Sequence, residues 1–251
     1  MIPKSHPRYH SLMKREKLIE YFERGIVATA GLIAHGRGET FDYLLGERTT
    51  KFALEAERAA VAKMITAKNP VISVNGNVTA LAAKEVVKLS RLTNAKIEVN
   101  LFYRTEERIK KIVKEFEKYG VKILGDKPDA LIPRLEHKRA LCTTEGIYSS
   151  DVVLVPLEDG DRAQALKKMG KFVITIDLNP LSRTARAADI TIVDELTRAL
   201  RNMIEFSRVI TKENSEKILS NYRNREILSR ALTHIKERLE KLATDSQALR
   251  V

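Results

Sequence analysis

Two kinds of hydrophobic pattern alternate along most of this chain. Short runs rich in Val and Ile are separated by longer segments in which apolar residues recur every three or four positions. The short runs predict buried β-strands, and the longer segments predict amphipathic helices. The predicted strands are residues 71–75, 96–102, 121–124, 152–156, 172–176 and 190–193.

Predicted helices lie between these strands and on either side of the strand-bearing region. They are residues 12–25, capped by Ser11, and residues 50–68, 78–92, 105–119, 161–170, 195–209 and 215–242. A helix between consecutive strands implies a crossover connection, and therefore a parallel sheet whose two faces are both covered. The pattern thus predicts a doubly wound α/β domain over residues 70–210.

Helical segments are predicted to flank this core. Residues 1–69 are expected to pack on the core as an N-terminal helical segment, and residues 211–251 form a C-terminal one. Residues 125–150 show little periodicity and are expected to be an ordered excursion. The C-terminal helix carries an apolar seam of two heptads, which fits either docking on the chain's own core or dimerisation. The seam comprises Leu228, Leu232, Ile235, Leu239 and Leu242.

The charge balance narrows the class of partner. The chain has 45 Lys and Arg against 33 Asp and Glu, a formal net charge of +12. This surplus favours an anionic partner, such as a phosphorylated metabolite, a nucleic acid or an acidic membrane surface. The basic residues form no tract with interleaved aromatic residues, which argues against nucleic acid. The longest apolar stretch, residues 26–34, is too short to cross a bilayer.

The remaining composition excludes several kinds of site. The single cysteine, Cys142, excludes an internal disulfide and a cysteine metal cluster, and it has no nearby histidine with which to form a nucleophilic triad. His6 and His10 lack a third zinc ligand, so no metal ligand is assigned. Residues 1–10 lack the apolar core of a secretory signal, and we expect a cytoplasmic protein. Abundant Lys, Arg and Glu without Trp are typical of a thermophilic source.

Polar residues follow several predicted strands directly. In a parallel sheet the carboxyl ends of the strands meet at one edge, where ligands bind. The stretches at this edge are Asn75, Gly76 and Asn77, then "FYRTEER" at residues 102–108, "PLEDGDR" at 156–162, and "DLNPLSRTAR" at 177–186. Their recurrence at one edge predicts a ligand site, and the helix after Asn75 offers free N–H groups to a phosphate or carboxylate.

Each stretch also has a structural interpretation. Asn75 and Gly76 could form an ordinary turn, and residues 156–162 a solvated loop with a helix cap. Asn179 could cap a short helix opened by Pro180. Arg183 and Arg186 could both be surface residues, and Arg186 receives no other role.

Residues 31–47, "GLIAHGRGETFDYLLGE", are predicted to form a flexible loop. Gly31, Gly36 and Arg37 nearly imitate a Walker phosphate loop, but Arg replaces the Lys and no Ser or Thr follows. The dinucleotide-binding fingerprint also fails, because its third glycine is missing. The functional interpretation is an anion clamp in which Arg37 contacts phosphate or carboxylate, and the alternative is a capped turn with a structural His35.

Taken together, these motifs resemble one known family. The segments "IPKSHPRY" (2–9), "REK" (15–17), "GLIAHGRGE" (31–39), "FDYLLGER" (41–48), "NPVISVNGNV" (69–78), "NLFYRTEER" (100–108), "VPLEDGDR" (155–162) and "GKFVITIDLNPLSRTARAADITIVDE" (170–195) carry the resemblance. They are similar to those of the archaeal phosphopantothenate synthetases, or 4-phosphopantoate–β-alanine ligases. The resemblance covers roughly residues 2–210.

The resemblance implies an activity and an assembly. Enzymes of this family join 4-phosphopantoate to β-alanine in coenzyme A biosynthesis and split ATP to AMP and diphosphate. They have a Rossmann-like fold and associate as homodimers. Mg²⁺ is expected with ATP on chemical grounds. Anionic substrates would also explain the basic net charge without nucleic acid.

The resemblance further implies the nucleotide contacts. They are Arg15, Arg37, Asp177, Leu178, Asn179, Arg183, Thr184, Glu195 and Leu196. Among these, Arg37 and Arg183 are assigned to the reacting phosphates, and Asp177 to the ribose hydroxyls. From the geometry of strand ends we assign 4-phosphopantoate to His35, Asn75, Gly76 and Asn77.

Two other classes of protein remain as alternatives. One is a non-catalytic nucleotide-sensing or nucleic-acid-binding α/β protein, whose binding would weaken steeply with salt. The other is a nicotinamide-dependent dehydrogenase, against which the incomplete glycine fingerprint argues.

Overall fold

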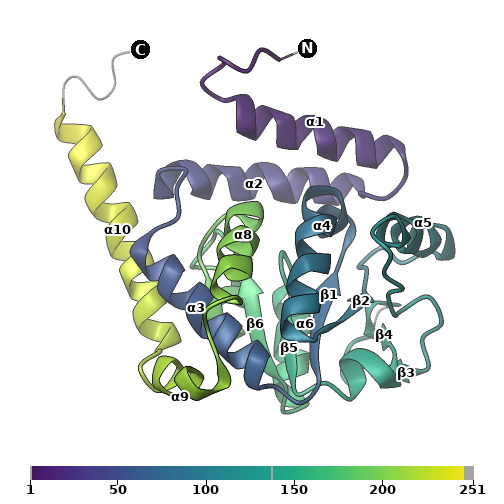
Figure 1. The fold of residues 1–251 in the computed structure, drawn as a ribbon. Coiled ribbons are helices and arrows are strands. Elements are labelled where there is room, and N and C mark those ends of the chain that lie inside the picture. Colours follow the sequence, from purple (N-terminus) through teal and green to yellow (C-terminus); the bar gives the residue numbers. More distant parts are fainter. Residues whose placement is uncertain (1, 137, 246–251) are drawn as a thin grey trace.

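A five-stranded parallel sheet forms the centre of the protein (Figure 1). The computed structural model describes residues 2–136 and 138–245. The strand order is β2 (Lys96–Val99), β1 (Pro70–Val74), β5 (Val152–Leu154), β6 (Phe172–Ile176) and β7 (Ile190–Ile192). All four neighbouring pairs are parallel, with Ile72 opposite both Ile97 and Leu154. The predicted α/β fold with a mostly parallel sheet is therefore confirmed.

Both faces of the sheet are covered, because alternate residues of each strand enter different apolar clusters. Ile72 and Val74 join the larger cluster beneath α3 (Lys51–Thr66), α4 (Gly76–Thr93) and α8 (Leu196–Phe206), whereas Val71 joins the smaller one beneath α6 (Gly160–Lys168). The larger cluster also contains Leu18 and Ile227, so residues from all three predicted segments share one core.

The N-terminal segment contains a helix where a flexible loop was predicted. After α1 (Tyr9–Glu23), residues 31–47 fall mainly within α2 (Thr29–Leu45), which ends at Gly46 in the left-handed conformation. The loop prediction was wrong because the glycines adopt helical geometry among good helix formers. At Gly31 a side chain would collide with Asn77, so glycine is required there by close packing. The predicted Ser11 cap was also wrong, since Arg8 is the N-cap of α1.

One further sequence prediction around the sheet needs correction, and two are confirmed. Residues 121–124 form no strand and contribute only an isolated bridge between Leu124 and Glu98. The helix after β2 is α5 (Glu106–Glu117), capped by Thr105 as expected. The excursion at 125–150 is ordered, with β3 (Ala130–Leu131) and β4 (Leu141–Cys142) in a small antiparallel sheet, η1 (Lys138–Ala140) and η2 (Thr144–Tyr148).

The predicted C-terminal helix is two helices. α9 (Lys212–Ser220) ends before α10 (Asn224–Thr244), because Asn221 to Arg223 turn the chain between them. α10 packs along α2 and α3, with Ile227 and Ala231 fully buried, while Leu232 and Leu239 of the seam stay exposed. The inner residues therefore dock on the chain's own core. Among the described residues, no helix has the length and apolar character needed to cross a membrane.

Candidate active site

The helix α2 lies across the carboxyl edge of the sheet (Figure 1). Residues of its inner face recur every three or four positions. Three of them, Gly31, Gly38 and Asp42, anchor the helix, and each contacts a different element. The Asn77 amide donates to the Gly31 carbonyl at 2.8 Å, and Gly38 lies against Leu178. Further along, Asp42 pairs with Arg198 at 3.0 Å. The helix therefore forms a roof over the residues that follow β1, β6 and β7.

The loop after β6 is held by its own polar side chains. Asp177 accepts hydrogen bonds from the Ser182 hydroxyl and, at 2.9 Å, from the Asn179 backbone N–H. Burial raises the pKa of Asp177, and these two hydrogen bonds oppose the rise. Ser182, and not Asn179, caps the short helix α7 (Arg183–Ala187), so the predicted capping role of Asn179 was wrong. Asn179 instead accepts from the Leu181 N–H at 2.9 Å.

The loops after β5 and β6 form one continuous polar edge. The Thr184 hydroxyl donates to the Glu158 carbonyl at 2.6 Å, and Gly160 packs directly against Arg183. Arg183 is exposed, and its guanidinium contacts Gln164 at 3.3 Å. The "EDGDR" and "SRT" stretches, predicted separately from the sequence, are thus brought together.

The Asn75, Gly76 and Asn77 stretch connects three elements. The Asn75 side chain caps α4 and donates to the Leu157 carbonyl at 3.0 Å, which links it to the β5–α6 loop. Gly76 approaches the Ile26 carbonyl so closely that a Cβ there would lie 2.5 Å from the oxygen. The sequence placed these residues at the edge correctly, but it did not predict that their side chains fix the neighbouring loops.

The end of β7 leads into the N-terminus of α8. Glu195 caps α8 and binds Lys14 of α1 at 2.8 Å, while Leu196 is buried. Burial alone would raise the pKa of Glu195, but the Lys14 ammonium holds it below its usual range. Glu195 therefore remains ionised at the strand edge that α1 and α2 cover.

The predicted cations of the N-terminal segment occupy different surroundings. Arg15 binds Glu39 at 2.5 Å and remains 41% exposed. Arg37 is exposed and has no hydrogen bond or ion pair with any described residue. It lies two positions beyond His35 and therefore points away from the inner face of α2. The structure places Arg15 and His35 near Glu39, but it does not bring Arg37 to the strand ends within this chain.

Comparison with known proteins supplies the family. The sequence model of the phosphopantothenate/pantothenate synthetase family matches residues 52–238. A 4-phosphopantoate–beta-alanine ligase from Thermococcus kodakarensis is 57% identical, over 97% of this chain and 95% of the relative. Enzymes of the same name from Thermococcus onnurineus and Methanosarcina mazei are 58% and 54% identical, over 96% and 98% of this chain and 95% and 98% of the relatives. The chain belongs to the phosphopantothenate/pantothenate synthetase family. This confirms the resemblance, and it favours the ligase over both alternatives.

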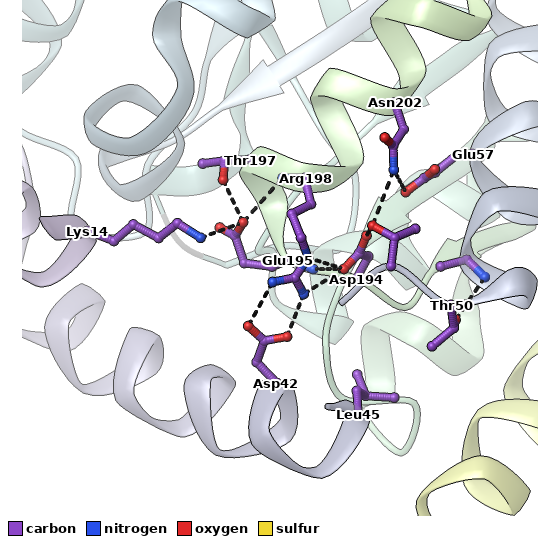
Figure 2. Close-up of polar contacts among 12 residues, drawn as sticks. Lys14, Asp42, Leu45, Thr50, Glu57, Asp194, Glu195, Thr197, Arg198 and Asn202 are labelled. Carbon is purple, nitrogen blue, oxygen red and sulfur yellow. Dashed lines mark hydrogen bonds and ion pairs between the residues drawn. The ribbon is translucent and has the colours of Figure 1, made fainter. Parts of the chain in front are cut away.

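One network in this family member was not predicted from the sequence (Figure 2). Arg198 of α8 binds Asp42 of α2 and Asp194 after β7, while Asp194 also accepts from the Thr49 hydroxyl at 2.5 Å. Glu57 of α3 lies fully buried beside it and accepts from Asn202 at 3.3 Å. Asp194 belongs to the polar residues after a strand, which was the signal available. Asp42 and Arg198 are 156 positions apart, so no local pattern connects them.

A second unpredicted residue is Arg162. Its side chain is fully buried, where it pairs with Glu158 and donates to the Ser73 hydroxyl at 3.1 Å. It therefore fixes the β5–α6 loop, which accepts a hydrogen bond from Thr184, to the neighbouring strand β1. The "EDGDR" stretch contained this residue, but its charge suggested a ligand contact and gave no sign of complete burial.

The chemistry available at this edge is charge stabilisation and hydrogen bonding. The N-termini of α4, α7 and α8 open here, with Arg15, Lys14 and Arg183 beside them. Among the described residues no group of three or more metal-ligating side chains occurs. Such an arrangement suits polyanionic substrates that react with one another.

Proposed function

We propose that the protein condenses (R)-4-phosphopantoate with β-alanine to 4′-phosphopantothenate, with cleavage of ATP to AMP and diphosphate. The observation that carries this proposal is the shared name of relatives that are 54–58% identical over nearly the whole chain. The reaction belongs to archaeal coenzyme A biosynthesis. Its need for ATP as a substrate supports the cytoplasmic location expected from the sequence.

The reaction proceeds through an acyl adenylate. The substrate carboxylate attacks the α-phosphorus of ATP and diphosphate leaves; the β-alanine amine then attacks the acyl carbon and AMP leaves. Neither step needs a nucleophile from the enzyme, which supports the proposal for a chain without a predicted triad. The protein's task is to hold the substrates in line and to neutralise the charge that develops at phosphorus.

We assign the nucleotide to the edge formed after β6 and β7. Asp177 and Asn179 accept from or donate to the nucleoside, while Leu178, Glu195 and Leu196 line its position. Arg183 supports a phosphate role because its exposed guanidinium has one weak neutral partner, Gln164 at 3.3 Å. Thr184 and Arg15 complete the phosphate contacts, whereas Arg37, which the sequence placed among them, lies away from the strand ends within this chain. Mg²⁺ enters with ATP and binds mainly phosphate oxygens, so it requires few protein ligands.

The phosphopantoate position is assigned to the neighbouring edge after β1. There the N-terminus of α4 at Gly76 and Asn77 faces the inner side of α2, where Asn77 contacts Gly31 and His35 follows about one helical turn later. A helix N-terminus stabilises a bound anion through its free N–H groups and its dipole. This arrangement brings the acid substrate next to the nucleotide phosphates.

We also infer that the active form is a homodimer. Large apolar side chains are exposed on α1 and α2, namely Met13, Ile19, Phe22 and Ile33. Exposed apolar side chains that gather on one surface are typical of subunit interfaces. Sedimentation equilibrium should give twice the chain mass of 28.4 kDa.

The proposed function is tested by measuring diphosphate release. Release over many turnovers should require ATP, Mg²⁺, 4-phosphopantoate and β-alanine together, and AMP and 4′-phosphopantothenate should accumulate in equal amounts. Release at the same rate without the acid substrate would contradict the proposal. Tight RNA or DNA binding that weakens steeply with salt, without this reaction, would support the nucleic-acid-binding alternative.

A further inference from the structure

His35 occupies a defined position on the inner face of α2. It lies four residues after Gly31 and three before Gly38, and both glycines are anchors of that face. Gly31 is held by Asn77, just after β1, and Gly38 lies against Leu178, just after β6. Residues at these spacings share one side of a helix, so His35 faces the strand ends between these anchors.

The spacing of the anchors matches the spacing of the strands. Seven helical residues from Gly31 to Gly38 span about 10.5 Å. The two anchor points belong to β1 and β6, which are separated by one strand, β5. Two strand spacings amount to about 9.6 Å. His35 therefore lies above the carboxyl end of β5, at the centre of the sheet edge.

The surroundings of His35 leave its ring nitrogens available to accept a proton. The side chain is partly buried, and its ring makes no hydrogen bond with any described residue. Burial lowers the pKa of His35 below its usual value. The charged groups near it act in opposite directions on this pKa: Glu39 on α2 and Glu195 after β7 raise it, whereas Lys14 and Arg15 on α1 lower it. After β1 and β6 the contacts of α2 are the uncharged Asn77 and Leu178, and the loop after β6 also carries the carboxyl group of Asp177, which Ser182 and the Asn179 N–H hold.

We propose that His35 accepts the proton from the ammonium group of β-alanine and so generates the attacking amine. This inference rests on the proposed ligase function and assigns one residue to its second step. An uncharged imidazole at neutral pH is a suitable acceptor for this proton. The position above the middle strand lies between the assigned phosphopantoate and nucleotide sites, where the mixed anhydride forms.

The step balances in atoms and charge. One N–H bond of the β-alanine ammonium breaks, and its proton passes to a ring nitrogen of His35. The freed lone pair forms the C–N bond at the acyl carbon, and the C–O bond to AMP breaks, so AMP leaves with that electron pair. The nitrogen loses its second proton to water or to the AMP phosphate, whose second pKa is about 6.

The first measurement compares the two half-reactions in the His35→Gln variant. Glutamine retains hydrogen-bonding capacity but takes up no proton. Exchange of labelled diphosphate into ATP, with saturating 4-phosphopantoate and without β-alanine, should stay within about threefold of the wild type, because saturation offsets the lost contact with that substrate. Formation of 4′-phosphopantothenate at pH 7 should fall roughly a hundredfold to ten-thousandfold. His10→Gln, which changes an exposed histidine of α1, should alter neither rate.

Two further readouts separate proton transfer from positioning. In the variant, the rate with β-alanine should rise about tenfold per pH unit, because only the amine that is already uncharged reacts. Hydroxylamine is largely uncharged at pH 7, so it should trap the acyl adenylate at the same rate in the variant and the wild type.

The outcomes are distinct. If diphosphate exchange, amide formation and hydroxylamine trapping fall together in His35→Gln, the residue positions substrate and the inference is wrong. If amide formation is unchanged, the inference is likewise wrong. If the wild-type protein supports no exchange with 4-phosphopantoate, the proposed function itself fails, independently of His35.

Discussion

Arg183 and Arg186 are two exposed arginines on one short helix, yet their surroundings differ. Arg183 lies against Gly160 and contacts Gln164 at the edge shared by the β5 and β6 loops. The side chain of Arg186 has no hydrogen bond or ion pair with any described residue, and only its backbone N–H is bonded, to the Ser182 carbonyl at 3.2 Å. This difference supports the proposed phosphate contact for Arg183 and leaves Arg186 as a surface cation of the same helix.

We expect Arg183→Ala to weaken ATP use at least tenfold, seen as a higher KM for ATP or a lower kcat/KM. A hydrogen bond to a charged group contributes about 1.5–3 kcal/mol, which corresponds to roughly a tenfold to hundredfold effect. Steady-state kinetics with ATP as the varied substrate measure it. Arg186→Ala is the matched control and should stay near the wild-type value; equal kinetics for both variants would remove Arg183 from the site.

At the residue scale, the sequence predicts what is adjacent in the chain and misses what folding brings together. Asp177, Asn179 and Ser182 follow one strand, so their shared loop was predictable. The pairing of Arg198 with Asp42 was not, because it joins α8 to α2. Arg162 was located, but its burial depends on Ser73 of another strand.

At the scale of elements, the position of α2 depends on a few contacts with the strand edge. Three glycines led the sequence to predict a loop there, because glycine disfavours helices when packing is ignored. Packing reverses this expectation at Gly31, where Asn77 leaves no room for a side chain. The pairing of Asp42 with Arg198 then fixes the other end of α2 above β7.

Arg198→Met should loosen this end of α2. The change leaves Asp42 and Asp194 without their cation, and Asp194 is nearly fully buried. Breaking such a pair costs about 3–5 kcal/mol of unfolding free energy. Guanidinium unfolding should show this loss, whereas Arg201→Met, at an exposed position of the same helix, should change stability by less than about 0.5 kcal/mol. Similar losses in the two variants would show that the network does not hold α2.

At the scale of the whole molecule, the alternation of strands and helices was sufficient to predict a parallel sheet covered on both faces. The strand order was not predicted, because the side to which each crossover turns depends on packing between elements. The apolar seam of α10 likewise did not decide whether this helix docks on the chain's own core or forms a dimer. Ile227 and Ala231 reach the same core as the sheet, and this core includes the buried carboxyl group of Glu57.

Glu57 should make global stability depend on pH. Burial, assisted by Asp194, raises the pKa of Glu57 to about 9, so the folded protein keeps a proton that the unfolded chain releases at a lower pH. The stabilisation is complete below the unfolded pKa and is lost as pH rises towards 9, with a slope of about 1.4 kcal/mol per pH unit.

Unfolding measured from pH 5 to 9 tests this dependence. The stability of the wild type relative to Glu57→Gln should fall steadily as pH rises, because glutamine resembles the protonated acid but does not titrate. Glu55→Gln, which changes a side chain that is 45% exposed on the same helix, should give a curve parallel to the wild type. A Glu57→Gln curve parallel to the wild type would contradict the assigned protonation.

The most direct test of the central claim follows the carboxylate oxygens of 4-phosphopantoate. If the carboxylate attacks the α-phosphorus of ATP, one of its oxygens leaves with AMP when the amide forms. With substrate labelled by ¹⁸O in the carboxylate, mass spectrometry should find one ¹⁸O in each AMP produced. Label in inorganic phosphate, or AMP without label, would contradict activation through an acyl adenylate.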